Sequence, residues 1–305
     1  MKIVYLAGMG RSGSTIIGKV LSQLKDFFYI GEMKQVWKYG ISKNTLCGCG
    51  LNFSDCPIWS SVISRAFGIR AKEIAQKMIY MQRNTLRERH APIIRFLNNP
   101  MKFIDKRISQ EYRWAINRLY QEIARVTGAN IIVDSTKTAT YGLLIKNILD
   151  CPVYVLHIVR DPGAVAYSWK RSKNHNISGI KVAMRRFSTI KTVLRWGIRN
   201  WSVEQALRPF VDGFMLVRYE DFVNNPKKLV RAILKFVHED SDLSFIHNHK
   251  VSLKETHSVW GNPGRLLHGD IKIKLDNEWK ISQSNVQRII IKVLLCIYLY
   301  RYSYL

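Results

Sequence analysis

The segment MKIVYLAGMGRSGST, residues 1–15, determines most of the expected fold. Its apolar run, residues 3–7, predicts a buried β-strand, and the glycine- and serine-rich stretch after it predicts a tight loop. Apolar residues then recur at helical spacing from Ile16 to Leu24. A strand, a glycine loop and a helix in this order favour an anion site, because loop N–H groups and the helix dipole converge there.

This loop fits the phosphate-loop pattern G-x-x-x-x-G-K-[ST] from Gly8 to Thr15, except that Ser14 replaces the Lys. In nucleoside triphosphatases that Lys contacts the β- and γ-phosphates. The nearest cation here is Arg11, whose planar guanidinium suits a tetrahedral oxyanion. The loop therefore predicts an anion site that does not hydrolyse ATP. A strand-to-helix turn without a ligand is the alternative.

The composition is that of a folded, strongly basic protein. The chain has 305 residues, 47% of them hydrophobic, and its 48 Lys and Arg against 22 Asp and Glu give a net charge of +26. Such a charge suits a polyanionic cofactor, an acidic substrate, nucleic acid or an anionic membrane surface. The excess is spread along the chain, so charge alone does not choose among these partners.

The chain shows no secretory signal before its first expected strand and no run long enough to cross a membrane. We therefore expect a cytoplasmic protein. The apolar stretch 289–299 is interrupted by Lys292, which predicts a docked C-terminal helix within residues 285–305. The Tyr-rich end of the chain makes peripheral membrane contact a minority alternative.

Three of the five cysteines cluster as Cys47, Cys49 and Cys56. A tetrahedral zinc site takes four ligands, and no fourth lies near them in the sequence. We favour structural thiols in a tight turn, ahead of a disulfide and then of a metal site, and predict no metal ligands. Cys151 and Cys296 are expected in the core.

The histidines suggest no site either. His157 lies within an expected strand and is predicted to be a core residue. The late histidines lack metal-binding spacing on one helix face: His247, His249, His257 and His268.

Strand and helix patterns alternate along the chain. Strands are expected in residues 3–7, 28–30, 130–133, 153–159 and 213–217. Helices are expected in residues 15–24, 111–126, 138–149, 163–171, 182–207 and 226–237. This order predicts a three-layer α/β fold, with a phosphate-loop-type parallel sheet flanked by helices. We expect one domain over residues 1–305, a helical insertion at about 60–125 on the acceptor side, and a loop segment at 241–269.

A second anion site is expected after the fourth strand, which ends at Arg160. Asp161 and Pro162 predict a helix start, with an N-cap acceptor followed by Pro at the first helical position. Ser168 lies about two helical turns further on. Because ligands of open α/β sheets bind beyond the carboxyl ends of the strands, Arg160 and Ser168 can form an anion clamp. A surface Arg paired with a carboxylate is the alternative.

Loop and clamp together resemble the sulfotransferase family that uses 3′-phosphoadenosine 5′-phosphosulfate (PAPS), in its bacterial and carbohydrate- or tyrosyl-protein-type branch. The stretch 10–15 resembles the family's 5′-phosphosulfate loop, and Arg160 with Ser168 its 3′-phosphate motif. Tyr219 resembles a residue on the adenine side, and Arg265 one in a late loop over the 3′-phosphate. The resemblance assigns cofactor binding to Gly10, Arg11, Ser12, Gly13, Ser14, Thr15, Arg160, Ser168, Tyr219 and Arg265.

The same resemblance implies the chemistry. Glu32 would be the general base, and Lys137 and Arg11 would stabilise charge near the transferring group. No His stands where the small-molecule branch of the family has its base. The sulfuryl group would pass from PAPS to a hydroxyl acceptor by in-line displacement, leaving adenosine 3′,5′-bisphosphate and needing no metal. Glycans, protein tyrosines, lipids and small alcohols all qualify as acceptors, and the net charge leans towards an acidic glycan.

Two other functions stay open at this stage. A phosphate-loop kinase of a small hydroxyl compound is disfavoured by Ser14, and because no Asp-ended second strand for magnesium is evident. A non-catalytic binder of an anionic polymer would need the basic charge but not Glu32. We expect no nucleic-acid partner.

Overall fold

The computed structural model describes residues 1–85, 87–171, 174–177, 180–183 and 186–305. A five-stranded sheet runs through its centre in the order β2-β3-β1-β4-β7. Its strands are β1 (Lys2–Gly8), β2 (Phe27–Gly31), β3 (Ile131–Lys137), β4 (Val153–Val159) and β7 (Gly213–Arg218). All four neighbouring pairs are parallel. The predicted α/β class and all five predicted strands are confirmed.

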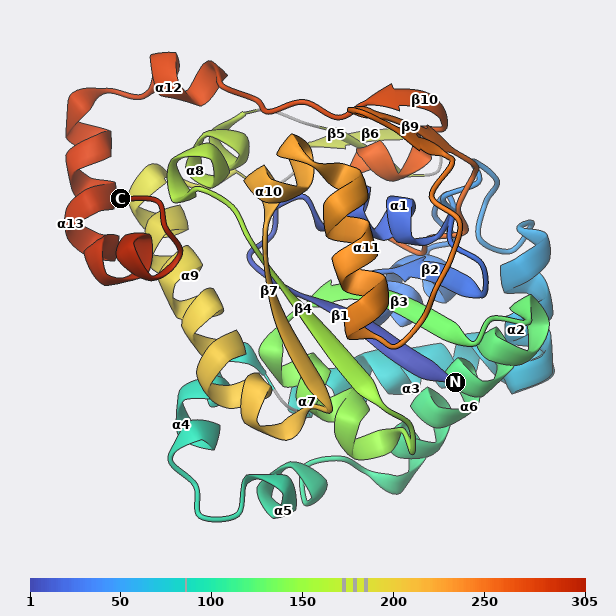
Figure 1. The fold of residues 1–305 in the computed structure, drawn as a ribbon. Helices are drawn as coiled ribbons and strands as arrows, with labels where there is room; N and C mark the ends of the chain where they lie inside the picture. Colours follow the sequence, from blue (N-terminus) through green and yellow to red (C-terminus); the bar gives the residue numbers. More distant parts are fainter. Residues whose placement is uncertain (86, 172–173, 178–179, 184–185) are drawn as a thin grey trace.

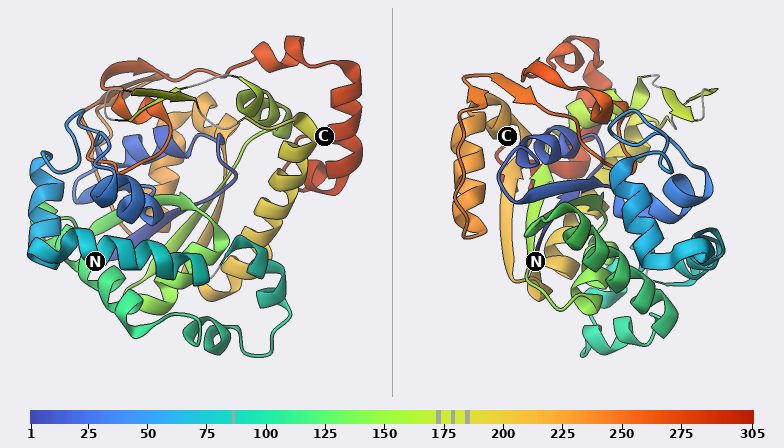
Figure 2. Two further views of the ribbon diagram at one scale, coloured as in Figure 1. Left: turned by 180° about the vertical axis from the view of Figure 1, so that it is seen from behind. Right: turned by 90° about the vertical axis from the view of Figure 1, so that its right-hand side faces the viewer.

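Helices cover both faces of the sheet (Figures 1 and 2). One face packs against α1 (Ser14–Leu21) and α11 (Pro226–Phe236), and the other against α6 (Gln110–Thr127) and α7 (Ala139–Ile148). β1 is buried from Ile3 onward, as expected of a central strand with helices on both faces. β1 is the central strand. β3 and β4 lie on either side of it, and β2 and β7 form the edges of the sheet.

The described residues of the stretch 60–125 form helices and contain no strand, as expected, whereas the place of this insertion on the acceptor side stays a prediction. It consists of α2 (Pro57–Phe67), α3 (Ala71–Asn84), α4 (Ala91–Arg95), α5 (Pro100–Asp105) and most of α6. α2 and α6 pack against each other and bury Trp59 and Tyr112. Shorter turns occupy Met33–Gln35, Val36–Ser42, Gly68–Arg70, Glu88–His90, Val203–Leu207, Arg208–Phe210 and Pro263–Leu266 (η7).

The helix predicted at 182–207 is wrong at its start. Strand β6 (Ile180–Ala183) pairs with β5 (Asn174–Ile177), and α9 begins only at Thr189 and ends at Ser202. Residues 184–185 lie outside the described part of the chain. The alternation of Ile180, Lys181 and Val182 is a strand period, and Ser188 caps the helix by accepting from the Lys191 N–H.

The segment predicted as loop, 241–269, also contains regular structure. β8 (Ile246–His247), β9 (Lys250–Leu253) and β10 (Gly269–Lys272) form a small antiparallel sheet. Val251 and Leu253 bury their side chains while Lys250 and Ser252 are exposed, a period-two pattern too short to stand out in the sequence.

The C-terminal helix is confirmed as a docked helix. α13 (Asn285–Arg301) follows α12 (Glu278–Ser282) and packs against α9. Ile291 and Leu295 are buried, while Cys296 is exposed, so its predicted core position is wrong. Cys151, predicted in the core as well, is half-buried. Among the described residues, no helix has the length and apolarity to cross a membrane.

Candidate functional site

The five parallel strands end at one edge of the sheet, and each end carries a residue predicted for the site. Because the strands are parallel, their carboxyl ends meet at the same edge. The residues at or directly after these ends are the loop that begins at Gly8 (β1), Glu32 (β2), Lys137 (β3), Arg160 (β4) and Tyr219 (β7, which begins α10, Tyr219–Asn224). The sheet topology therefore gathers residues that are far apart in the sequence.

The loop between β1 and α1 has the left-handed backbone that its composition predicts. Arg11 has φ 74° and Gly13 has φ 92°. A Cβ atom on Gly13 would lie 2.1 Å from the Tyr219 ring, so only glycine fits there. No side chain caps the N-terminus of α1 and no acidic residue stands in its first turn. This terminus therefore favours an anion.

Arg160 lies beside this loop. Its Nη1 donates to the Arg11 carbonyl over 3.3 Å, and its guanidinium stacks 4.8 Å from the Tyr219 ring centre. The predicted helix start is confirmed: Asp161 accepts from the Gly163 N–H at 2.7 Å, and α8 runs Pro162–Lys170. Strand β4 and helix α8 thus hold Arg160 against the loop.

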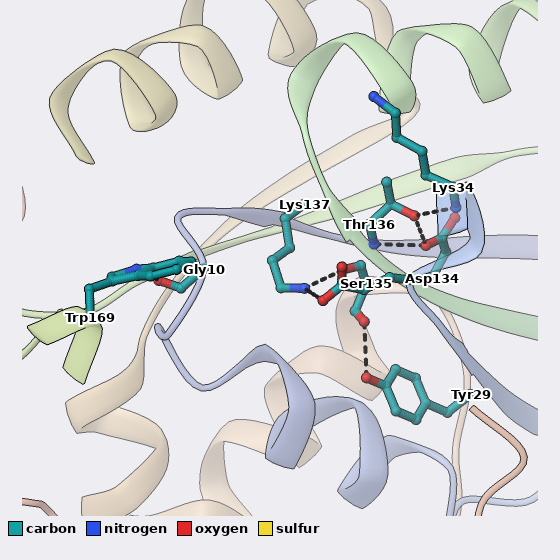
Figure 3. A network of polar contacts seen from close by, with 9 residues as sticks. Gly10, Tyr29, Lys34, Asp134, Ser135, Thr136, Lys137 and Trp169 are labelled. Carbon is teal, nitrogen blue, oxygen red and sulfur yellow. Dashed lines mark hydrogen bonds and ion pairs between the residues drawn. The ribbon is translucent and has the colours of Figure 1, made fainter. Parts of the chain in front are cut away.

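Trp169 is a site residue that the sequence reasoning missed. Its Nε1 donates to the Gly10 carbonyl over 3.1 Å, and the Arg11 guanidinium lies 5.2 Å from its ring centre. Figure 3 shows the indole next to Gly10. The only signal in the sequence was its position directly after Ser168. Trp169 thus sets the orientation of both the loop backbone and Arg11.

Glu32 and Lys137 form an ion pair, with 2.5 Å between Lys137 Nζ and Glu32 Oε1. The ammonium group also donates to the Ser135 carbonyl at 2.9 Å, a contact drawn in Figure 3. The side chains of Lys137 and Glu32 are 12% and 22% exposed, so both remain open to the cavity. The two residues predicted for proton and charge transfer are therefore direct partners.

A buried carboxylate, Asp134, supports the end of β3. Its Oδ1 accepts from the Thr136 N–H and hydroxyl at 2.8 and 2.7 Å, and its Oδ2 from the Tyr120 hydroxyl at 2.6 Å. Burial raises the pKa of Asp134 to about 6, against these hydrogen bonds, which lower it. Figure 3 shows the contacts of Asp134 with Thr136 beside Lys137. Asp134 thus shapes the turn that presents Lys137.

A cavity of about 770 Å³ lies over these strand ends. Nine of the predicted site residues line it: Gly10, Arg11, Gly13, Ser14, Thr15, Glu32, Lys137, Arg160 and Ser168. The lining also includes cations that the sequence reasoning missed, namely Lys34, Arg195 and Arg199, against one further carboxylate, Glu88. Burial lowers the pKa of Lys34 and of Arg11, because both cations lose water. The cavity is therefore built for an anionic ligand.

Three predicted site residues do not line the cavity. Ser12 is buried, and Tyr219 packs under the loop against Gly13 and Arg160. Arg265 is only 4% exposed, and its guanidinium donates to the carbonyls of Ser258 at 3.1 Å and Leu46 at 2.6 Å. Arg265 therefore joins two loops, although its neighbours Gly261, Asn262 and Gly264 do line the cavity.

The cysteine cluster gains a residue that the sequence reasoning excluded. His257 lies beside Cys47, Cys49 and Cys56, and the four ligand atoms are within 4.8 Å of one another. The expectation that no fourth ligand is near was wrong, because the chain returns to the cysteines only after about 200 residues. His157 is buried as predicted, and burial lowers its pKa to about 4.

Comparisons with known proteins agree with this geometry. A family model described as "Sulfotransferase family" matches residues 4–242, more than half of the chain. The solved structure "Sulfotransferase Domain from the Curacin Biosynthetic Pathway" is similar with a TM-score of 0.51 and 16% identity, over 96% of each chain. A sulfotransferase from Alicyclobacillus acidocaldarius aligns at 13% identity over 96% of this chain and 94% of its own, with a TM-score of 0.37. No curated protein matches.

The family match covers the strand–loop–helix unit, the Glu32–Lys137 pair and the Arg160 clamp within one continuous range. The first of the two solved structures supports the same α/β fold. The chain therefore belongs to the sulfotransferase family and is an enzyme of sulfuryl transfer.

Proposed function

We propose that this enzyme transfers the sulfuryl group of PAPS to a hydroxyl acceptor, with Glu32 as the general base. The observation that carries the proposal is the 2.5 Å contact between Glu32 and Lys137 in the wall of the same cavity as the phosphate loop. A carboxylate and an ammonium group at that place can serve the acceptor and the donor side of one displacement.

The residues of the cavity suit such a donor. Its volume of about 770 Å³ lies in the usual range of cofactor pockets. Two anion-binding parts lie in it side by side: the loop of residues 10–15 at the start of α1, and Arg160 with Ser168. PAPS carries two separate anionic groups, a 5′-phosphosulfate and a 3′-phosphate, and would supply an already activated sulfuryl group.

Different residues of the cavity would accept the proton and stabilise the leaving group. The Glu32 carboxylate would accept the proton of the acceptor hydroxyl as that oxygen attacks sulfur. Lys137, Arg11 and the loop N–H groups would stabilise the negative charge that grows on the leaving phosphate oxygen. Positive charge from these residues takes the place that magnesium has in phosphoryl transfer.

We propose an acidic hydroxyl compound, such as an acidic glycan, as the acceptor. Six cationic side chains line the cavity against two carboxylates: Arg11, Lys34, Lys137, Arg160, Arg195 and Arg199 against Glu32 and Glu88. The excess of four positive charges is about the charge that PAPS itself neutralises, so the preference for an acidic acceptor rests on the net charge of +26 over the whole chain.

A kinase function finds less support in the geometry. Ser14 replaces the loop lysine, and Asp134, the carboxylate on the strand β3 beside β1, uses both oxygens for Tyr120 and Thr136. The sequence reasoning overlooked that Asp134 ends a hydrophobic strand run. Its engaged oxygens leave it a structural role.

Calorimetry tests the donor, comparing adenosine 3′,5′-bisphosphate with ATP and magnesium. We expect micromolar or tighter binding of the bisphosphate without magnesium, at a Kd of about 1 μM or below, and none of ATP. Binding of ATP with magnesium and not of the bisphosphate would contradict the proposal. Transfer of ³⁵S from labelled PAPS to acidic glycans, neutral sugars and tyrosine peptides then tests the acceptor class.

A further inference from the structure

A second polar cluster lies outside the cavity, where the loop of residues 47–56 meets the segment 256–258. The sulfur atoms of Cys47, Cys49 and Cys56 and a ring nitrogen of His257 lie within 4.8 Å of one another. Cys56 Sγ is 3.2 Å from His257 Nδ1. Ligand atoms around a tetrahedral zinc ion lie about 3.3–3.8 Å apart, so only a small contraction separates this cluster from that geometry.

The ligand types point to zinc. Three cysteines and one histidine are a standard set for structural zinc, with about 2.3 Å for Zn–S and about 2.0 Å for Zn–N. Soft thiolate ligands disfavour magnesium and calcium, which take oxygen. The three thiols of the cluster are available as ligands, since none of the five cysteines forms a disulfide.

Backbone contacts already hold the two loops together at this point. Gly48 N–H donates to the Ser258 carbonyl at 3.0 Å, and Trp59 Nε1 to the His257 carbonyl at 2.6 Å. A Cβ on Gly48 would lie 2.4 Å from the Thr256 carbonyl oxygen, so glycine permits the close approach. The histidine is therefore positioned before any ion binds, which lowers the entropic cost of coordination.

A buried cation stands next to the cluster. Three thiolates and one histidine around Zn²⁺ leave a net charge of −1, which needs compensation away from water. The Arg265 guanidinium donates to the carbonyls of Leu46 and Ser258, the residues directly before Cys47 and after His257. The burial of Arg265 fits a negatively charged metal site beside it.

We propose that Cys47, Cys49, Cys56 and His257 bind one structural zinc ion. Four protein ligands close the coordination shell, so the site is structural rather than catalytic. The ion would fix the segment that continues into the cavity wall: the Trp260 carbonyl accepts from the Glu32 N–H at 3.3 Å, and Gly261 and Asn262 line the cavity. Zinc would thus hold one wall around the base.

Metal analysis of the full chain tests the proposal directly. We expect about one zinc ion per chain after purification without chelator, released when an organomercurial blocks the thiols. Cobalt added to the metal-free reduced protein should give the intense visible bands of tetrahedral coordination with thiolate. Cys49→Ser should lose most of the zinc, whereas Cys151→Ser, which changes a half-buried cysteine outside the cluster, should keep it.

Several outcomes would overturn the proposal. They are a folded wild-type protein that takes up no zinc, a Cys49→Ser variant with undiminished zinc, and a disulfide between two of the three cysteines in peptide maps of unreduced protein. Circular dichroism of each variant separates loss of metal from loss of fold. Metal content is measured without donor or acceptor, so its failure is distinguishable from a failure of the proposed sulfuryl transfer.

Discussion

The phosphate loop and the cysteine loop are both glycine-containing turns rich in polar groups, yet they are built in opposite ways. The phosphate loop is continuous: residues 8–15 contain the turn, the hydroxyls and the cation. The cysteine loop is incomplete by itself, because its fourth member, His257, follows about 200 residues later. A local motif can be recognised in a sequence. The number of residues in a site cannot be determined from the sequence when tertiary contacts bring one of them from a distant segment.

The two regions are also physically joined. His257 and Trp260 lie on one segment, and the Trp260 carbonyl accepts from Glu32. Lys19 of α1 donates to the carbonyls of Arg265 and Leu267 on the same stretch. Burial lowers the pKa of Lys19 to about 8. The segment 257–267 therefore connects the helix behind the phosphate loop with the cysteine loop. A substitution that disturbs the structure of one region should also disturb the other.

The largest effect should come from Glu32→Gln. We expect turnover to fall by about 10²–10⁴-fold, because the amide cannot accept the acceptor's proton. Binding of adenosine 3′,5′-bisphosphate in calorimetry should stay close to wild type. Glu88→Gln is the matched control, since Glu88 lines the same cavity, and it should keep most of the activity. Equal losses in both variants would contradict a specific role for Glu32.

Substituting alanine for Gly13 in the phosphate loop and for Gly50 in the cysteine loop compares the two loops directly. Both glycines have left-handed backbone, at φ 92° and 87°, but a Cβ on Gly13 meets the Tyr219 ring while one on Gly50 meets nothing within 4 Å. Gly50→Ala should lower the free energy of unfolding by about 1 kcal/mol through backbone strain alone. Gly13→Ala should cost about 2–5 kcal/mol, because overpacking adds to that strain.

Chemical denaturation of both variants, with bisphosphate affinity as a second measurement, checks this pair. Only Gly13→Ala should also weaken the bisphosphate affinity. If the two substitutions lower the free energy of unfolding equally, the contact with Tyr219 does not contribute to stability. The phosphate loop is then no more constrained than the cysteine loop.

The pH dependence of the unfolding free energy should reveal the protonation of the Asp134 carboxylate. Its pKa is raised from 3.8 to about 6, so the folded protein binds this proton more tightly than the unfolded chain. The resulting stabilisation is complete below about pH 4 and is lost as the pH rises through 6. Asp134→Asn keeps an acceptor for Thr136 and can donate to the Tyr120 hydroxyl, but it does not titrate.

Between pH 4 and 6, wild type should therefore lose about 1–3 kcal/mol of unfolding free energy relative to Asp134→Asn. Urea denaturation of both proteins at several pH values measures this difference. Parallel stability curves would mean that Asp134 does not titrate in this range.

An effect no larger than that of Asp134→Asn should come from Trp59→Phe in the second region. The substitution removes the 2.6 Å hydrogen bond from Trp59 Nε1 to the His257 carbonyl and keeps an aromatic ring in the core. We expect a loss of about 1 kcal/mol in unfolding free energy, because a partly buried carbonyl loses its donor. Trp114→Phe, at a half-exposed position, should change it by less than about 0.5 kcal/mol in the same thermal or urea assay.

Much of the fold was predictable from local pattern. All five strands of the sheet and the start of α8 at Asp161 follow from apolar runs and capping residues. The start of α9 and the strands of the late segment were missed, because their periods are short and tertiary pairing decides between helix and strand. The sequence also gave no measure of exposure along α13, so Cys296 was misplaced.

The candidate site was predictable to a similar degree. Residues next to a recognisable strand end or loop, such as Glu32, Lys137 and Arg160, do line the cavity. Arg265 was expected near them because its loop is near, but its side chain turns into the junction of two loops. Trp169 and Arg199 were missed because a single Trp or Arg on a helix carries no positional signal.

By itself, the sequence determined the parallel sheet, the glycine loop before α1 and the residue types at the strand ends, because these depend on residues close together in the chain and on local backbone preferences. Only the tertiary structure decided that Glu32 pairs with Lys137, that Arg265 is buried, and that His257 completes the cysteine cluster. Those contacts depend on packing between segments, where distance along the chain says nothing about distance in space.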